Sequence, residues 1–314
     1  MNLLFIRGRL PLDFRPDRLE YDQIDQCEDM WAVLAERLSR HFNKTQLWYW
    51  GSGEKAKVKK VTDKFTEVWM NEKSLPEFKP DIIIARGGFN ENWGICKKFP
   101  DAKKVYYGAG VRYKPQKGNW DLILVDSAKQ QKKIPGSKLF VKPAADNLFY
   151  PMDVEKKYDV CFMANATQMD IKRHKLAFNS LRNFKVLHLG LSNDKIKGYK
   201  NVTVGGWHRR RKLPKLISQC RVGLICSTDY DSCPRVLTEY LACGIPVVAT
   251  RNMNFWHEKY VNPDTGILCG DDDIAKSIRK VLDGSYPNVY NYYKNNLSVD
   301  VSTDMLLGYL GKLK

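Results

Sequence analysis

Asp231 and Glu239, two carboxylates separated by seven residues, form the pattern in this chain that is best suited to chemistry. Glu239 lies in a stretch whose apolar residues recur at helical spacing. A carboxylate on a buried, amphipathic helix is unusual unless it binds something. Hydroxyl groups of a sugar or a ribose are natural partners, because a carboxylate accepts two hydrogen bonds in a fork. The pattern therefore predicts a site for a hydroxyl-rich ligand.

A site for phosphate is indicated just before Glu239. Ser232 is a good N-cap, and Pro234 suits the first turn of the helix that would follow. The bare backbone N–H groups of residues 232–235, which include Cys233, lie beside the guanidinium of Arg235. Both kinds of group favour a bound anion. We therefore expect this helix start to contact phosphate.

Lys172 and Arg173 are a second pair of phosphate candidates. They follow a predicted strand over 157–163 and open a predicted helix that ends near Asn183. Cations at a helix start oppose the helix dipole, and a bound anion would compensate them. The alternative interpretation is a solvated basic turn.

The elements that must position these residues alternate between short apolar strands and amphipathic helices. Buried strands are predicted at 3–6, 46–50, 81–85, 104–107, 120–125, 157–163, 185–190, 201–205, 222–226 and 245–249. Helices are predicted at 21–42, 172–183, 213–219, 271–282 and 302–313, and before Gly244. This alternation predicts an α/β fold with parallel sheets.

Parallel α/β sheets bind ligands at the carboxyl ends of their strands. In the first half of the chain, the candidates for such a position directly follow or end predicted strands: Arg7, Gly8, Arg9, Gly87, Gly88 and Gly108. We interpret them as candidates for ligand binding at this edge of the sheet. Ordinary surface turns are the alternative.

The stretch around the two carboxylates resembles the C-terminal signature of retaining, nucleotide-sugar-dependent glycosyltransferases of the GT-B fold (glycosyl transferases group 1, family 4-like). In that family an acidic residue, seven residues and a glutamate precede a small-residue helix end and a Pro-Val-Val strand. Here these are Asp231, Glu239, 242–244 and 246–248. The family more often has glutamate at the first position and a glycine-rich loop where residues 232–235 stand. The alternative is a plain βα unit with an exposed Glu239.

A second match lies over Pro143–Phe149, Pro-Ala-Ala-Asp-Asn-Leu-Phe. Related transferases have a proline, two small residues, an aspartate and a phenylalanine at the end of their first domain. The proline stops a strand, the small residues allow a tight crossing, and Asp146 can anchor local N–H groups. We interpret the segment as a structural crossover between domains.

The resemblance implies two Rossmann-like domains that face a central cleft. It places an acceptor-binding domain at 1–150 and a nucleotide-sugar donor domain at 151–301. The helix over 302–314 would cross back to the first domain. The implied reaction moves a sugar from a nucleoside-diphosphate sugar to a glycan, a lipid-linked or another hydroxyl acceptor, with retention and with neither metal nor further cofactor.

The resemblance also assigns roles to residues of the second half. Glu239 would hold the ribose hydroxyls, and Asp231 would position the donor sugar. Arg173, with Lys172 or Arg235, would stabilise the charge on the departing diphosphate.

Gly206 and Trp207 lie where the family contacts the nucleobase. They follow the predicted strand over 201–205, so we expect them at the carboxyl end of that strand.

The composition leaves other functions open. The net charge is +17, from 52 Lys and Arg against 35 Asp and Glu, which favours nucleic acid, an anionic membrane surface or an acidic substrate as partner. No specific nucleic-acid motif is present. The basic run 208–212 could attract a phosphate-bearing acceptor or a membrane, or be a solvated loop. The alternatives are a nucleotide-sugar hydrolase or epimerase on the same fold, and a non-enzymatic polyanion-binding protein.

The sequence also favours a cytoplasmic protein, peripheral on a membrane surface at most. The N-terminal apolar run is too short for a signal peptide, and no apolar run could span a bilayer. The eight cysteines show neither CxxC pairs nor histidine partners, so we expect no zinc site. Cys220, Cys226 and Cys243 lie in apolar stretches and are interpreted as small core residues.

Overall fold

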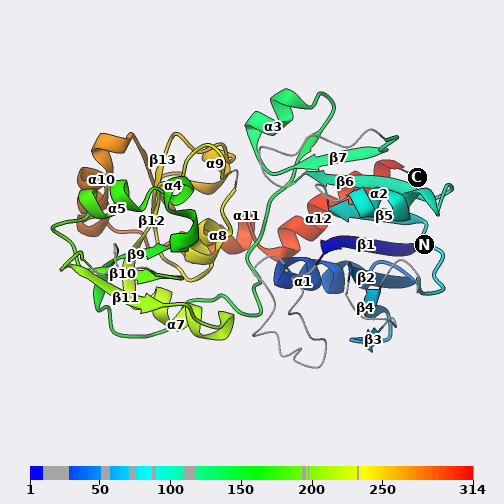
Figure 1. Cartoon of the computed structure of the whole chain (residues 1–314), viewed down its shortest axis with the longest axis horizontal. Coiled ribbons are helices and arrows are strands. Elements are labelled where there is room, and N and C mark those ends of the chain that lie inside the picture. The colour runs from blue at the N-terminus through cyan, green and yellow to red at the C-terminus, as the bar shows by residue number, and fades with distance from the viewer. Residues whose placement is uncertain are drawn as a thin grey trace. The chain divides into compact units, whose positions relative to one another are not determined.

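The computed structural model of the chain divides into two compact units. Unit 1 comprises Met1–Phe140 with Ser302–Lys314, and unit 2 comprises Val141–Val301. The structure describes residues 1–9, 28–50, 57–70, 75–86, 90–108, 118–192, 196, 198–231 and 233–313. Each unit has its own sheet flanked by helices, so the predicted α/β fold is confirmed (Figure 1).

The division between the units falls between Phe140 and Val141, whereas the sequence predicts it near residue 150. Lys142, near the start of unit 2, makes two hydrogen bonds within that unit. Its backbone N–H donates to the Tyr260 hydroxyl at 2.8 Å, and its Nζ donates to the Cys233 carbonyl at 2.7 Å. The segment Pro143–Phe149 consequently belongs to unit 2.

Unit 1 is built on an eight-stranded sheet in the order β3-β4-β2-β1-β5-β6-β7-β8. Its strands are β1 Asn2–Arg9, β2 Lys44–Trp50, β3 Lys57–Lys60, β4 Phe65–Met70, β5 Ile82–Arg86, β6 Lys103–Gly108, β7 Leu122–Val125 and β8 Lys138–Leu139. Its helices are α1 Glu28–Ser39, α2 Asn90–Lys97 and α3 Ala128–Lys133, and most of α12 Val299–Leu310 belongs to it as well. All neighbouring strands pair in parallel except β3 and β4.

Both faces of the unit 1 sheet are covered by apolar side chains. Ile95 and Cys96 of α2 pack on one face, in a cluster with residues of β1, β2, β4 and β5. On α1, Trp31 contacts Phe5 and Tyr107, with ring centroids 5.5 and 5.0 Å apart. Burial on both sides explains why these strands read as nearly continuous apolar runs.

Unit 2 is built on a six-stranded parallel sheet in the order β11-β10-β9-β12-β13-β14. Its strands are β9 Tyr158–Met163, β10 Val186–Leu189, β11 Val202–Gly206, β12 Cys220–Ile225, β13 Val247–Thr250 and β14 Gly266–Cys269. Its helices are α4 Met169–Lys172, α5 His174–Ser180, α7 Leu213–Ser218, α8 Arg235–Ala242, α9 His257–Tyr260, α10 Ile274–Asp283 and α11 Val289–Asn296. Short 3-10 helices span Ala166–Gln168, Arg210–Lys212 and Asp271–Asp273.

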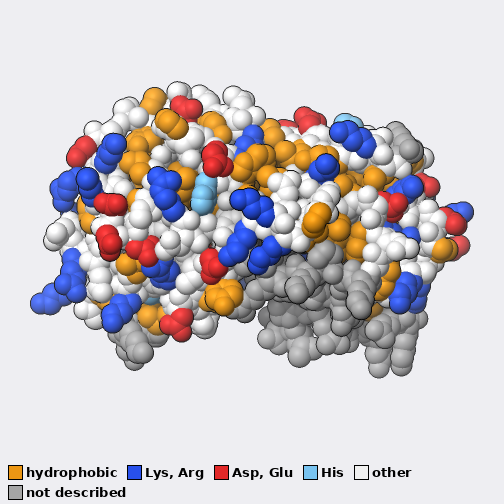
Figure 2. Space-filling model, turned by 90° about the horizontal axis from the view of Figure 1, so that it is seen from above, with side chains coloured by type: hydrophobic (Ala, Val, Ile, Leu, Met, Phe, Trp, Pro, Cys, Tyr) orange, Lys and Arg blue, Asp and Glu red, His pale blue; other side chains and the backbone are white. Residues whose placement is uncertain are grey.

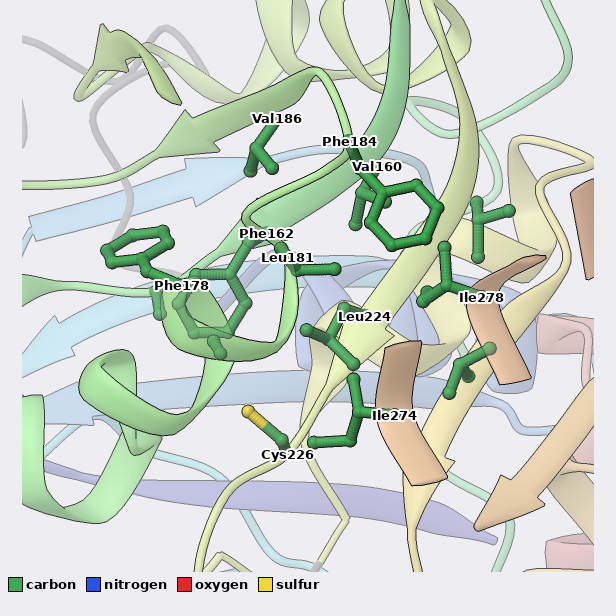
Figure 3. Packing of buried hydrophobic residues seen from close by; sticks show 14 of the residues in the cluster. Val160, Phe162, Phe178, Leu181, Phe184, Val186, Leu224, Cys226, Ile274 and Ile278 are labelled. Atoms are coloured by element: carbon green, nitrogen blue, oxygen red, sulfur yellow. The ribbon is translucent and has the colours of Figure 1, made fainter. Parts of the chain in front are cut away.

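The core of unit 2 lies between its sheet and the helices α5 and α10. Phe178 of α5 and Leu181, which ends that helix, belong to one buried cluster with Leu224 of β12 and with Ile274 and Ile278 of α10 (Figure 3). On the opposite face, α8 packs so closely that a Cβ at Gly223 would lie 2.2 Å from the Tyr240 ring. The sheet is thus buried on both faces, as a parallel sheet requires.

The order of the strands places a topological switch point between β9 and β12. From β9 the chain proceeds outward to β10 and β11, and then returns to the other side of β9 for β12, β13 and β14. Open α/β sheets bind ligands at the carboxyl ends of the strands that flank such a point. We therefore expect the loops after β9 and β12 to contact the ligand.

The charge and the cysteines also have structural counterparts. Figure 2 shows Lys and Arg side chains scattered over the face in view, with Asp and Glu between them. Cys220, Cys226 and Cys243 are buried, which confirms their interpretation as core residues. Within the described ranges, no helix has the length and apolar content needed to cross a membrane.

Candidate nucleotide-sugar site of unit 2

Helix α8 carries Glu239 at the centre of the candidate site. Leu237, Tyr240 and Leu241 are fully buried and fix the helix on the sheet. The Tyr240 hydroxyl donates to the Cys161 carbonyl at 3.1 Å and accepts from the Met163 N–H at 2.9 Å. Glu239 is itself only 2% exposed, so its carboxylate is held in the protein and not in solvent, as the sequence pattern predicts.

The ends of α8 show one confirmed prediction and one correction. Gly244 has φ 71° and ends the helix, as expected for a left-handed C-terminal residue. The start is different, because α8 begins at Arg235 and Pro234 has extended ψ 130° at the N-cap position, without a side-chain cap. Cys233 is buried, and its carbonyl accepts from Lys142, which fixes the backbone one residue before Pro234. Ser232 lies outside the described residues.

Arg210 is the ionic partner of Glu239. Its Nη2 donates to Glu239 Oε1 at 2.9 Å, and the two side chains are 6% and 3% exposed. The guanidinium carbon lies 4.8 Å from the centroid of the Phe149 ring. The basic run 208–212 is therefore not a uniformly solvated loop, since one of its arginines is buried against the predicted ribose carboxylate.

Lys172 and Asp231 meet across the switch point. Lys172 ends α4 after β9, Asp231 follows β12, and the lysine Nζ donates to Asp231 Oδ2. Both side chains are about one-fifth exposed, at 19% and 18%. The two loops are also tied through the backbone, because the Thr228 N–H donates to the Ile171 carbonyl at 2.8 Å. Two of the three predicted catalytic residues are thus brought together.

Arg173 is bound to Asp271, at the carboxyl end of β14. Its Nη1 donates to Asp271 Oδ1 at 2.9 Å, and its Nη2 donates to Oδ2. Asn252 Nδ2 also donates to both oxygens, each at 3.0 Å. The hydrogen bonds to Asp271 raise the pKa of Arg173 above its ordinary value.

The predicted helix start at Lys172 and Arg173 is wrong. Lys172 is the last residue of α4, Arg173 adopts φ 55° and ψ 45°, and α5 begins at His174 and ends at Ser180. Lys172 therefore lies where the helix dipole favours a cation, and the argument that an anion must compensate it does not apply. The left-handed residue turns the chain and splits the expected single helix in two.

His174, the residue after Arg173, packs against His188 in the interior of unit 2. Both are fully buried, with ring centroids 5.5 Å apart and with Phe162 and Phe178 around them. His188 Nε2 lies 2.9 Å from the Ala164 carbonyl oxygen, which places the proton on that nitrogen. Burial lowers the pKa of His174, and burial together with His174 lowers the pKa of His188 to about 4. Both rings are therefore neutral packing elements at neutral pH.

Gly206 and Trp207 lie at the carboxyl end of β11. Gly206 has φ 79°, and a Cβ there would meet no atom within 4 Å. Trp207 is 56% exposed, although it is a large aromatic residue. Gly190, at the end of β10, has φ 131°, and a Cβ there would lie 2.5 Å from the Ala164 carbonyl oxygen. The carboxyl ends of β10 and β11 thus combine close backbone packing at Gly190 with an exposed aromatic side chain at Trp207.

The acceptor candidates of unit 1 are only partly described. Gly87 and Gly88 lie outside the described residues, and only the backbone is described at Gly8 and Arg9. The strand predicted at 3–6 is longer than expected, because β1 continues to Arg9 with a change of register against β2 after Ile6.

Arg7 and Gly108 can be placed in unit 1. Arg7 is 5% exposed. Gly108 ends β6, and its carbonyl accepts from Gln130 Nε2 at 3.0 Å. Both lie toward the carboxyl end of the sheet, as predicted. Among the residues that the structure describes, no group of three His, Cys, Asp or Glu side chains could hold a metal ion.

Sequence reasoning missed Arg210, Asn252 and Asp271 as members of the site. In sequence, Asp271 is only the first residue of the helix predicted at 271–282, and Arg210 is only one cation of the run 208–212. The available signal was position: Asp271 directly follows β14 and its Gly270, and Arg210 lies just beyond β11 and Gly206. Both follow strands whose carboxyl ends share one edge.

Comparison with known proteins supports the assignment of unit 2. Residues 160–284 match the model of the family described as glycosyl transferases group 1. No curated protein matches the chain at sequence level. The matched segment contains Lys172, Arg173, Arg210, Asp231 and Glu239, but not Phe149.

Solved structures match over the full length of the chain. A sucrose-phosphate synthase from Thermosynechococcus elongatus is 12% identical, with a TM-score of 0.74 over 99% of this chain and 98% of that one. HepE of Anabaena, solved with UDP, is 12% identical, with a TM-score of 0.67 over 99% and 100%. The lipopolysaccharide outer core galactosyltransferase WaaB is 15% identical, with a TM-score of 0.67 over 99% and 100%. At these identities the likeness shows a shared fold. The chain therefore shares the GT-B fold of these structures, and its residues 160–284 match glycosyl transferases group 1.

Proposed function

We propose that the protein transfers a sugar from a nucleoside-diphosphate sugar to a hydroxyl acceptor, a glycan or a lipid-linked glycan, with retention of anomeric configuration. The observation that carries the proposal is the buried Glu239 carboxylate on α8, within the segment that matches glycosyl transferases group 1. HepE, which shares the fold, was solved with UDP, with UDP and glucose, and with UDP-glucose. These likenesses support a nucleotide sugar as the donor.

The proposed roles follow from the charges at the switch point. Glu239 holds the ribose hydroxyls, while Trp207, with Gly206, contacts the base. Lys172 and Arg173 each hold a carboxylate in this structure. Diphosphate oxygens are acceptors of the same kind, so the donor takes over these hydrogen bonds as it binds. The two cations then stabilise the negative charge that grows on the diphosphate as the glycosidic bond breaks.

Asp231 gains its role through the same exchange. Once Lys172 turns to the diphosphate, the Asp231 carboxylate is released to accept hydrogen bonds from the donor sugar. No protein nucleophile is assigned. We further propose that the reaction needs neither a metal nor a cofactor besides the donor, because the two cations supply the charge. The proposed setting is the cytoplasm, with transient contact to an anionic membrane where a lipid-linked acceptor is used.

A nucleotide panel tests the function. UDP, GDP, ADP, CMP and dTDP are compared by thermal shift, and the sugar nucleotides of the best base are then assayed for transfer and hydrolysis. One nucleoside diphosphate at a hundred times its Kd is expected to stabilise the protein by about 2.7 kcal/mol. Glu239→Gln keeps the side-chain shape and should lose more than about tenfold in activity, or roughly 1.4 kcal/mol. If Glu239→Gln keeps its activity within about tenfold of the wild type, the ribose assignment is wrong.

Two further outcomes decide the alternatives. Release of free sugar without transfer to any acceptor would favour a hydrolase. Strong, salt-dependent polyanion binding without a thermal shift from any nucleotide would favour a non-enzymatic protein. Transfer that persists in excess EDTA supports the metal-independent reaction, and its loss overturns that part of the proposal.

A further inference from the structure

Arg210 stands apart from its neighbours in the basic run 208–212. It is 5% exposed, whereas Arg209, Arg211 and Lys212 are exposed. It opens the 3-10 helix Arg210–Lys212, which leads directly into the buried start of α7. This position turns the Arg210 side chain into unit 2, where it meets Glu239.

Burial of this ion pair is costly. Two charged groups that leave water lose several kcal/mol of hydration each, and their attraction repays this only with good geometry. A pair of apolar residues of similar volume would often be as stable. The stability of the fold therefore does not explain why this ion pair is buried. A functional role for a carboxylate inside the protein would explain it.

The geometry leaves half of the carboxylate for a ligand. Arg210 binds Oε1 of Glu239, and Oε2 makes no hydrogen bond to another residue in the described part of the chain. The guanidinium is itself held over the Phe149 ring at 4.8 Å. Phe149 is 1% exposed and ends the Pro143–Phe149 segment, so the guanidinium packs on a buried ring.

We propose that Arg210, supported by Phe149, is a specificity-determining positioning residue of the nucleotide site. It holds the Glu239 carboxylate in one orientation, so that Oε2 accepts a hydrogen bond from a ribose hydroxyl. The site then selects a ribonucleoside diphosphate over its 2′-deoxy counterpart. This inference rests on the proposed function, and in particular on Glu239 as the ribose ligand.

The chemistry explains why the pair gives selectivity. An ionised carboxylate only accepts hydrogen bonds, so a ligand that lacks the hydroxyl leaves it without its partner. Sites built around such a bond discriminate strongly against the analogue without the hydroxyl, whereas apolar pockets do not. Without Arg210, the Glu239 carboxylate would lose the hydrogen bond that fixes its orientation. The affinity ratio of the two nucleotides is therefore the quantity that Arg210 controls.

The experiment compares UDP with 2′-deoxy-UDP, or GDP with 2′-deoxy-GDP if GDP binds better in the panel. Their Kd values are measured by calorimetry for the wild type and for Arg210→Met, Glu239→Gln and the double variant. We expect the wild type to prefer the ribonucleotide by tenfold or more. Each single variant should bring the ratio close to one, and the double variant should lower it no further. Arg211→Met, the same change at an exposed neighbour, should keep the full ratio.

Other values of the affinity ratio would contradict the proposal in different ways. Equal weakening of both nucleotides by Arg210→Met, with the ratio kept, would make Arg210 purely structural and overturn the proposal. A wild type that binds nucleoside diphosphates without preferring the ribose would overturn this inference while leaving sugar transfer in place. A wild type that binds none would instead remove the proposed function. If Arg210→Met does not fold, Arg210→Lys retains the charge and should keep most of the ratio. A folded lysine variant with a ratio close to one would contradict the proposal.

Discussion

The Asp271 carboxylate accepts two hydrogen bonds from the Arg173 guanidinium, although the two residues are 98 positions apart in the chain. Asp271 follows β14 and Arg173 follows β9, so the parallel sheet is what brings them to one edge. The cation proposed to receive the diphosphate is thus already neutralised by a carboxylate. Donor binding must compete with this pair, and the competition can be measured.

Removal of the Asp271 charge should strengthen nucleotide binding. In Asp271→Asn the guanidinium no longer has to leave a carboxylate, and a partly exposed ion pair is worth up to about 1 kcal/mol, or about fivefold in Kd. Calorimetry at low salt with the preferred nucleoside diphosphate measures the change. Asp272→Asn makes the same charge change one residue further on and should leave Kd as it is. Weaker binding by Asp271→Asn would show that Asp271 positions Arg173 and does not compete for it.

The side chain and the backbone of Arg173 can be tested separately. Arg173→Ala should lower kcat more than donor affinity, because the lost charge acts mainly on the departing diphosphate. Arg173→Gly should lose the same activity but be more stable than the alanine variant by about 1 kcal/mol, because φ 55° suits glycine. Lys175→Ala, at an exposed lysine of α5, serves as the control for activity. An unchanged kcat in Arg173→Ala would move the role to Lys172 or Arg235.

The packing of α8 on the sheet depends on the absence of a side chain at Gly223. In Gly223→Ala the new Cβ would lie 2.2 Å from the Tyr240 ring, so α8 must shift together with Glu239. We expect a loss of about 2 kcal/mol in the free energy of unfolding of unit 2, and weaker nucleotide binding. Gly270→Ala is the matched control, since its Cβ would have Asp273 Oδ2 as nearest neighbour at 3.7 Å. Equal stability of the two variants, by urea unfolding, would contradict this account.

The buried histidine pair makes unit 2 sensitive to acid. The unfolded chain protonates a histidine near its ordinary pKa of about 6.5, whereas burial and His174 lower the pKa of native His188 to about 4. As the pH falls from 6.5 toward 4, the unfolded state takes up protons that the native state does not, so stability declines, by about 3 kcal/mol for His188. Above pH 6.5 this contribution is flat.

Urea unfolding at pH 7.5 and pH 5 measures this decline. His188→Gln can still donate to the Ala164 carbonyl but does not titrate, so it should lose less stability between the two pH values than the wild type. His257→Gln changes a half-buried histidine that contacts the Met253 carbonyl, and it should keep more of the wild-type dependence. The same pH dependence in His188→Gln as in the wild type would exclude His188 as its source.

Many features of the fold can be predicted from short stretches of the sequence. Runs such as 222–226 are apolar without interruption because both faces of their strand are buried, and Gly244 ends α8 because it adopts a left-handed conformation. These features depend on a residue and its near neighbours. For the same reason Glu239 could be singled out, since one carboxylate on an otherwise apolar helix face is visible in sequence alone.

The tertiary structure decided which charges meet. Arg173 and Lys172 were predicted as the start of one helix, whereas the turn at Arg173 aims one cation at Asp271 and the other at Asp231. The pairing of Arg210 with Glu239 depends in the same way on strand order, because β11 lies at the sheet edge far from Glu239 in sequence. Ion pairs form between residues close in space, and in a parallel sheet that proximity is set by the crossovers and not by spacing along the chain.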